Sequence, residues 1–295
     1  MNEVFVAEPS SCENLEELRH LLSLFGPKSG RYLASYPVNW SSLLKKHFSQ
    51  LPPIETERLK TILRRALEQV AIVNNTSLAW DSTSDWIDNA LKLPPRVNQI
   101  VASPETKKTG ATTVAELDLP PTADEKVEAT PSEYVRVCKT LLIISPELIF
   151  VDPYLNPCRS DMRDVLEEML KAVKIGKCQR VTCWARESHV VGERSFSWQE
   201  VEGRIRAMLL KIEWPKDRNF EYLLVDDAHS TEKMHGRYLV SIKGGIRLEQ
   251  GFQRLSKGRS VDISPVGSKV HDDLLRYYYE GLHGMKVTQR FKAHP

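Results

Sequence analysis

The sequence predicts an α/β protein in which a mixed central sheet flanked by helices follows a mainly helical N-terminal part. Three observations predict this class. From Glu147 onward, short apolar runs alternate with segments of helical periodicity, which is the pattern of β-α units. Before Ser103, helical periodicity dominates. Hydrophobic residues make up 41% and charged residues 27% of the 295 residues, which is typical of a globular protein.

Residues 1–102 are predicted to form the mainly helical N-terminal domain. Val4–Ala7 is predicted to be a short strand, and residues 30–40 are expected to be turn-like to extended. The run "SSCENLEELRHLLSLFGP" has a serine cap, early acids and apolar residues at helical spacing before Gly26-Pro27 ends it. Three further helical segments follow: Trp40–Phe48, Ile54–Val73 and Ser84–Leu93.

Residues 103–132 are predicted to form an exposed linker or mobile insertion. The segment is rich in Thr, Pro, Ala and Glu, has no aromatic residue and shows little periodicity. Such a composition buries little apolar surface. The linker therefore divides the chain into two domains.

Residues 133–295 are predicted to form the α/β domain. Its expected order is β-α-β-α-β-β-β-α, and the later strands form a hairpin around Gly244-Gly245. The runs that predict these elements are "ELIFVDPYL", "SDMRDVLEEMLKAVKIG", "RVTCWAR", "SWQEVEGRIRAMLLKI", "FEYLLVDD", "KMHGRYLVSIKGGIRL", "SVDISPVG" and "SKVHDDLLRYYYEGL".

Composition excludes several broad classes. The net charge of +2 provides no bulk field for nucleic acid or anionic membrane, so such binding would need a local patch. No apolar run approaches the roughly 20 residues of a membrane span, and the first residues lack the pattern of a signal peptide. Five cysteines without a CxxC pair predict a reduced, cytoplasmic protein without a zinc site. No phosphate-binding or dinucleotide-binding motif occurs, so no cofactor and no metal are expected.

Polar residues follow the predicted strands at their carboxyl ends, where α/β sheets commonly bind ligands. His235 and Arg237 open the next strand, and alternation would place them on one face. Arginine binds phosphate in a bidentate manner and histidine can attack phosphorus or donate a proton, although a rim histidine is more often purely structural. The strand-end residues are Asp152, Tyr154, Arg186, Glu187, His189, Asp226 and Asp227.

A second set of basic residues is a candidate for phosphate or nucleic-acid contacts. It lies mostly in the segment after the predicted hairpin. The alternative is an ordinary solvated loop. Together with Arg186, the candidate phosphate-binding residues are Arg247, Arg254, Lys257 and Arg259.

The C-terminal part resembles the phospholipase D-like superfamily. The resemblance is carried by "LIFVDPYL", two β-α units, "HGRYLVSIKGGIRLEQGF" and "SVDISPV" before a final helix, roughly Ser132 to Leu282. It is most similar to the phospholipase D-like domain at the C-terminus of MIT-domain proteins and to its relatives in bacterial conflict and mobile-element defence systems. The N-terminal part shows no MIT-like helical hairpin.

Active members of that superfamily carry HxKxxxxD, in which the histidine forms a phosphohistidine and two motifs meet. His235 matches the histidine, Arg237 stands where lysine is expected, and Ile242 occupies the position of the aspartate. No second motif occurs. An orienting carboxylate is worth on the order of 10⁴ in rate in serine proteases, so its loss favours a degenerate site. Asp152 is the candidate substitute.

The resemblance implies a degenerate subunit of a prokaryotic defence or mobile-element system. It is expected to bind a partner protein in a multi-subunit complex, nucleic acid, or both, and not a membrane. The alternative is a metal-independent phosphodiesterase, a nuclease that acts as a homodimer through a His235 phosphohistidine, with Arg237 holding the phosphate.

Overall fold

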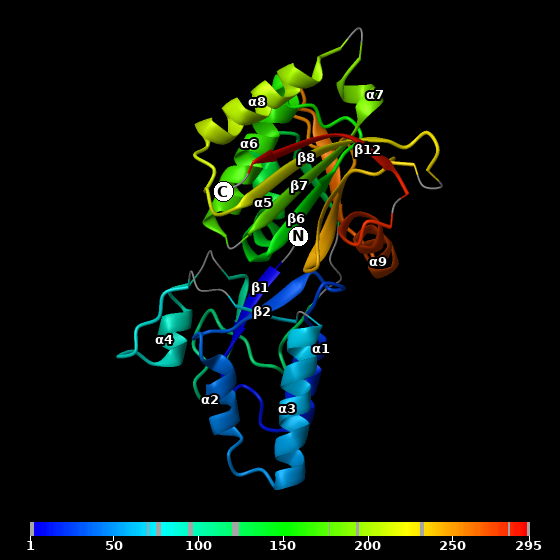
Figure 1. Cartoon of the computed structure of the whole chain (residues 1–295). Helices are drawn as coiled ribbons and strands as arrows, with labels where there is room; N and C mark the ends of the chain where they lie inside the picture. Colours follow the sequence, from blue (N-terminus) through cyan, green and yellow to red (C-terminus); the bar gives the residue numbers. More distant parts are fainter. Residues whose placement is uncertain are drawn as a thin grey trace. The chain divides into compact units, whose positions relative to one another are not determined.

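The chain folds into two compact units, each with its own sheet (Figure 1). The computed structural model describes residues 3–69, 71–74, 78–93, 97–119, 124–176, 178–192, 195–230, 233–282 and 284–293. The N-terminal unit extends to Thr122, and the C-terminal unit begins at Ala123. Both units combine strands and helices, and the C-terminal sheet is mixed. The α/β class predicted from the sequence is therefore confirmed.

A parallel sheet forms the centre of the N-terminal unit, and its described strands are ordered β3-β2-β1-β4. Helices connect these strands, because a parallel pair needs a crossover between its members. The strands are β1 (Glu3–Ala7), β2 (Arg31–Ala34), β3 (Ile72–Val73) and β4 (Gln99–Val101). The helices are α1 (Leu15–Ser23), α2 (Trp40–His47), α3 (Pro53–Glu68) and α4 (Trp86–Ala90).

Local sequence explains how the first two helices begin. The side chain of Asn14 accepts hydrogen bonds from the amides of Glu16 and Glu17, both at 3.0 Å, and so caps α1. The indole Nε1 of Trp40 donates to the carbonyl of Ala7 at 2.6 Å, which joins the start of α2 to the end of β1. The apolar face of α1 is buried through Leu15, Leu18, Leu21 and Leu22.

The N-terminal unit contains more helix than strand, but its parallel sheet was predicted only at Val4–Ala7. The helix expected over Ile54–Val73 ends at Glu68, and Val70 lies outside the described residues. The last part of that segment pairs with β2 instead, because the amide of Leu33 donates to the carbonyl of Ala71 at 2.9 Å. Pairing with a buried strand therefore outweighs the local helical pattern.

The predicted linker over residues 103–132 is wrong for its described residues. Ser103 donates its amide to the Glu8 carboxylate at 2.9 Å, and the amide of Ala102 donates to Thr112 at 2.8 Å. Residues 124–132 contain a strand of the C-terminal sheet and the start of its first helix. The segment 103–119 is ordered because a few apolar residues reach the core of the N-terminal unit: Val114, Leu117 and Leu119.

The C-terminal sheet has the order β12-β8-β7-β6-β9-β10-β11-β5 among the described strands. The central strands β6, β7 and β8 are parallel, and every other pair is antiparallel. The strands are β5 (Glu125–Glu128), β6 (Glu147–Val151), β7 (Arg180–Arg186), β8 (Asn219–Asp226), β9 (Tyr238–Ser241), β10 (Gly244–Leu248), β11 (Ser260–Pro265) and β12 (Lys286–Ala293).

Helices pack on both faces of this sheet. One core contains Phe150 of β6 together with residues of α5, α6 and α8, whereas the core on the other face contains Val151 and residues of α9. Successive residues of β6 enter different cores because strand side chains alternate. The helices are α5 (Pro131–Ile144), α6 (Ser160–Ile175), α7 (Glu187–Val190), α8 (Trp198–Lys211) and α9 (Ser268–Leu274), which continues as a π-helical turn (Leu275–Tyr279). No helix in the described ranges is long and apolar enough to cross a lipid bilayer.

The hairpin predicted around Gly244-Gly245 turns two residues earlier, at Ile242 and Lys243. Both glycines lie within β10. Gly244 has a φ of 149°, and a Cβ on Gly245 would lie 3.1 Å from Val266, so the glycines serve backbone conformation and close packing. Strand β9 begins at Tyr238, so the expectation that residues 235 and 237 lie within that strand is wrong.

Candidate functional site

The polar residues that follow the parallel strands of the C-terminal sheet lie together at the carboxyl ends of those strands. Asp152 follows β6, Arg186 ends β7, and Asp227 follows β8. Arg237 directly precedes β9, which runs antiparallel to β6 and starts where β6 ends, with Tyr238 opposite Val151. The sequence-based expectation that these side chains meet at one edge is therefore correct in its geometry. We call these residues and their contacts the sheet-edge site.

Asp152 is the most buried charged residue of the sheet-edge site, with no solvent exposure. Its two carboxylate oxygens accept separate amide hydrogen bonds, from Tyr154 at 2.9 Å and from Phe252 at 3.1 Å. Burial raises the pKa of Asp152, and these amides and the Arg237 charge offset only part of the rise. The carboxylate is thus fully engaged within the fold.

The side chain of Arg237 contacts Glu249, Asp152 and Tyr154. Its Nη1 donates to the carbonyl of Glu249 at 2.8 Å, and its Nε lies 3.8 Å from an oxygen of Asp152. The centre of its guanidinium is 5.3 Å from the centre of the Tyr154 ring, which is within cation–π range. Arg237 therefore compensates the buried Asp152 charge, and a bound phosphate would have to compete with that carboxylate.

Gly251 lets the loop after β10 close over this pair. Its φ is 71°, and a Cβ at this position would lie 2.0 Å from an Asp152 carboxylate oxygen and 2.7 Å from the Arg237 side chain. The backbone approaches the carboxylate closely enough for Phe252 to donate its amide. Only glycine satisfies both requirements. Sequence reasoning missed this residue.

A second ion pair fixes the segment before His235. Arg186 donates from Nε and Nη2 to one oxygen of Asp227, at 3.1 and 2.7 Å, and from Nη2 to the carbonyl of Met234 at 2.7 Å. The same Asp227 oxygen accepts the amide of Met234 at 2.9 Å. Lys233 donates to the carbonyl of Ala228 at 2.7 Å. These contacts join Asp227 and Ala228 to Lys233 and Met234.

The Asp227 charge is stabilised by these contacts. Burial alone raises the pKa of Asp227, but the Met234 amide and the Arg186 guanidinium outweigh it and hold the pKa below its ordinary value. Arg186 was predicted to contact phosphate. It is instead committed to Asp227 and to a backbone carbonyl, so it supplies little free positive charge.

His189 extends the sheet-edge site. Its Nε2 lies 3.0 Å from Nη1 of Arg186, and because arginine only donates, Nε2 must accept. The imidazole is therefore neutral in this arrangement, with its proton on Nδ1. Burial and the Arg186 charge lower the pKa of His189, against a smaller opposite effect of Asp227. The ring stacks on Tyr154 with centroids 4.3 Å apart.

His235 lies exposed at this edge, and no hydrogen bond joins it to another residue that the structure describes. Asp152, the proposed substitute for an orienting acid, binds the amides of Tyr154 and Phe252 and makes no hydrogen bond to His235. Ile242, which stands where the superfamily's motif has an acid, lies in the turn after β9, whereas His235 precedes that strand. The two residues flank opposite ends of β9, and seven residues of extended chain span about 20 Å.

The other candidate phosphate-binding residues do not join the sheet-edge site in any described contact. Arg254 lies 3.3 Å from Asp164 of α6, in an ion pair. Lys257 and Arg259 are exposed in the segment between β10 and β11, and Arg247 is exposed on β10. No group of three histidine, cysteine, aspartate or glutamate side chains suited to a metal occurs within the described part of the chain.

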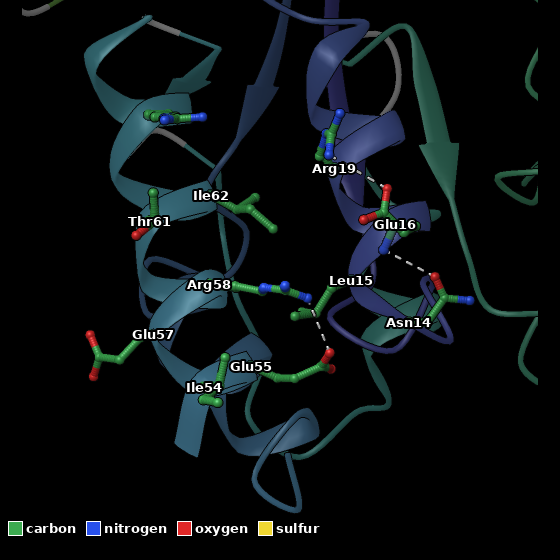
Figure 2. A pocket seen from close by; sticks show the side chains of 11 residues that line it. Asn14, Leu15, Glu16, Arg19, Ile54, Glu55, Glu57, Arg58, Thr61 and Ile62 are labelled. Atoms are coloured by element: carbon green, nitrogen blue, oxygen red, sulfur yellow. Dashed lines mark hydrogen bonds and ion pairs between the residues drawn. The ribbon is translucent and has the colours of Figure 1, made fainter. Parts of the chain in front are cut away.

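The N-terminal unit has a separate groove of about 870 Å³ between α1 and α3 (Figure 2). Arg58 and Glu55 pair at 3.5 Å on one wall, and Arg19 and Glu16 pair at 3.7 Å on the other. Ile54 lies at its end and is 73% exposed. Acidic and basic side chains balance along this groove, so it does not select a ligand of one charge.

Comparisons with known proteins identify no family for either unit. No protein-family model matches the chain, and no curated protein matches it. One similar solved structure is that of TrmBL2, an archaeal chromatin protein described as showing a novel mode of DNA binding. The alignment has 11% identity and a TM-score of 0.31, and it covers 85% of this chain and 72% of that one. A likeness at this TM-score carries no argument about fold or function.

Proposed function

We propose that this chain is a non-catalytic binding subunit with a phospholipase D-like C-terminal unit. Its role would be to hold a partner protein within a multi-subunit complex, with nucleic acid as a second ligand. The assignment to a cytoplasmic prokaryotic defence or mobile-element system depends on the resemblance of residues 132–282 alone.

The arrangement of strands supports the phospholipase D-like part of this proposal. Three parallel strands, β6 to β8, are followed by the antiparallel β9, β10 and β11 and then by α9. This is the order of elements on which the resemblance depends. The residue that matches the superfamily's histidine, His235, lies at the carboxyl edge of the parallel strands, where such sheets bind ligands.

The observation that carries the non-catalytic part is the engagement of Asp152. Its carboxylate is buried among two amides and the Arg237 guanidinium. A nucleophilic histidine needs a partner that fixes its tautomer and orientation. Because Asp152 makes no such bond, His235 lacks one among the described residues.

Charge compensation favours a protein partner over nucleic acid. Arg237 is paired with Asp152, Arg186 with Asp227, and Arg254 with Asp164. Nucleic-acid binding depends largely on uncompensated lysine and arginine side chains near phosphates. Of the candidate phosphate-binding residues, the exposed Arg247, Lys257 and Arg259 are left for that role.

The second candidate is the metal-independent nuclease. One observation favours it: His235 is solvent-exposed at the edge that also holds Arg237, so a phosphodiester can reach the imidazole. Two copies related by a two-fold axis would supply two histidines. His235 would attack phosphorus, the leaving oxygen would depart, and water would then hydrolyse the phosphohistidine.

Nucleic-acid assays test the proposal. Labelled single- and double-stranded DNA and RNA are incubated with the full chain in EDTA, beside His235→Ala and Arg254→Ala/Arg259→Ala variants. We expect no cleavage by any of the proteins. Metal-free cleavage that is lost in His235→Ala would establish the nuclease instead. Binding without cleavage that weakens in the arginine variant would assign nucleic acid as a ligand, and no binding would leave the protein partner.

A further inference from the structure

Strand β12 forms an outer edge of the C-terminal sheet, and among the described strands it pairs only with β8. A bulge lies between Val287 and Gln289, and from Gln289 to Ala293 the ladder is uninterrupted. In an antiparallel edge strand, alternate residues direct their N–H and C=O groups away from the neighbouring strand. Another extended chain can bind such groups as an additional strand.

The two faces of β12 differ in chemistry. Phe291 is buried, and the guanidinium of Arg206 on α8 lies 4.9 Å from the centre of its ring. Arg290 and Lys292, which flank Phe291 in sequence, are exposed and lie on the opposite face because side chains alternate. A strand added beside β12 would therefore meet positive charge on the face that carries Arg290 and Lys292, whereas Phe291 on the other face is already covered within the core.

The charge of β12 selects the kind of strand that fits. Lys286–Ala293 contains three basic residues and no acidic one. Lys292 bonds to Glu221 at 2.8 Å, whereas Lys286 and Arg290 form no ion pair with a described residue. A second copy of β12 would place like charges beside one another, which is unfavourable in a sheet. An acidic strand is the complementary partner.

The opposite edge of the sheet makes a second copy an unsuitable source of that strand. Strand β5 is only four residues long. Its Glu125 pairs with Arg136 at 3.0 Å, and its Glu128 accepts the amide of Gly258 at 3.0 Å. The acids of β5 are therefore already committed within their own chain.

We infer that the outer edge of β12 binds an extended acidic segment of the partner protein as an additional strand. Acidic side chains at alternate positions of that segment would face Arg290 and Lys292, and the residues between them would lie on the face where Phe291 is buried. The inference rests on the proposed binding function and adds the location and the chemistry of the contact.

The probe for this inference is a fluorescein-labelled eight-residue peptide of alternating glutamate and valine. Its binding to the full chain is measured by fluorescence anisotropy at low salt. A lysine–valine peptide controls for charge. A glutamate–valine peptide with N-methylated alternate amides keeps the charge but removes backbone donors. We expect binding of the first peptide only, with slowed amide hydrogen exchange over 286–293.

Reversing the charge of one residue of β12 is the second part of this test. Arg290→Glu is expected to weaken binding of the acidic peptide by about tenfold, because it removes one surface ion pair and adds a repulsion. Lys139→Glu on α5 and Lys269→Glu on α9 make the same charge change at other exposed positions and are expected to have little effect.

Three results would overturn the inference. Equal binding of the N-methylated peptide would show attraction by charge without strand addition. No binding of the acidic peptide would show that the lysines and arginine only protect the edge from pairing. Concentration-dependent dimers that dissociate in Arg290→Glu would assign the edge to a second copy. Each of these three results can occur while the chain still fails to cleave nucleic acid. The peptide experiments can therefore contradict this inference without contradicting the proposed function.

Discussion

Arg186 and Asp227 form a two-pronged ion pair in which Nε and Nη2 share one carboxylate oxygen, at 3.1 and 2.7 Å. Because both residues also bond to the backbone of Met234, the pair fixes the peptide that leads into His235. The arginine predicted to contact phosphate is therefore part of the framework of the sheet-edge site.

Asp227→Asn should destabilise the protein. The substitution keeps an acceptor for Met234 but leaves the Arg186 charge without its counterion in a largely buried position. We expect a loss of about 2 kcal/mol in the free energy of unfolding, measured by urea denaturation. Asp226→Asn is the matched control, since Asp226 is less buried and, among the described residues, accepts a hydrogen bond only from the amide of Ala228. Equal losses in the two variants would contradict this role of the pair.

The imidazole of His189 should titrate below the ordinary range for histidine. Burial and the neighbouring Arg186 disfavour its cationic form, so the pKa is lowered. A group with a lowered pKa stabilises the fold above its unfolded-state pKa, and that contribution is lost as pH falls through the folded-state value. NMR titration of the ring proton measures the pKa directly. A midpoint at or above the ordinary value for histidine would show that Nε2 does not accept from Arg186.

Gly251→Ala should be more damaging than an ordinary substitution of a left-handed glycine. A Cβ at Gly251 meets the Asp152 carboxylate, whereas Gly258 has a similar φ of 79° and nothing within 4 Å of a built Cβ. Gly258→Ala therefore reports backbone strain alone, at about 1 kcal/mol. We expect Gly251→Ala to cost at least about 2 kcal/mol more, measured by thermal unfolding. Similar melting temperatures would mean that the loop does not close on Asp152.

Replacing Arg237 with methionine should destabilise the protein, because it leaves the buried Asp152 carboxylate without its positively charged neighbour. At pH 8 we expect a loss of about 1–3 kcal/mol in the free energy of unfolding. The loss should shrink as pH falls, because a carboxyl whose folded-state pKa is raised destabilises the fold as pH rises through that value. Unfolding at several pH values measures this trend. Arg247→Met, at an exposed position of β10, should show no such trend.

The sequence predicted the central strands better than the outer ones, for physical reasons. β6, β7 and β8 are buried and read as apolar runs between turn residues. Strand β12 has few apolar residues, and β4 has only three residues, so neither produces a pattern that local periodicity can detect. These strands depend on pairing with partners that are distant in sequence.

The sheet-edge site was predictable in outline only. The rule that strand-end residues gather at one edge placed Asp152, Arg186 and Asp227 correctly. Which acid meets which base depends on loop conformation, and Asp152 and Arg237 lie 85 positions apart in sequence. Ile242, which local spacing aligns with the acid of the motif, lies in the turn after β9, at the other end of that strand from His235.

The claim that His235 does not act as a nucleophile is tested most directly by metal-free turnover of bis(p-nitrophenyl) phosphate. Nitrophenolate release by the full chain in EDTA is compared with release by His235→Ala. Because no acid among the described residues orients the exposed imidazole, we expect both proteins to release nitrophenolate at the buffer rate. A rate above buffer that is abolished in His235→Ala, together with a phosphohistidine mass increment at residue 235, would contradict the account.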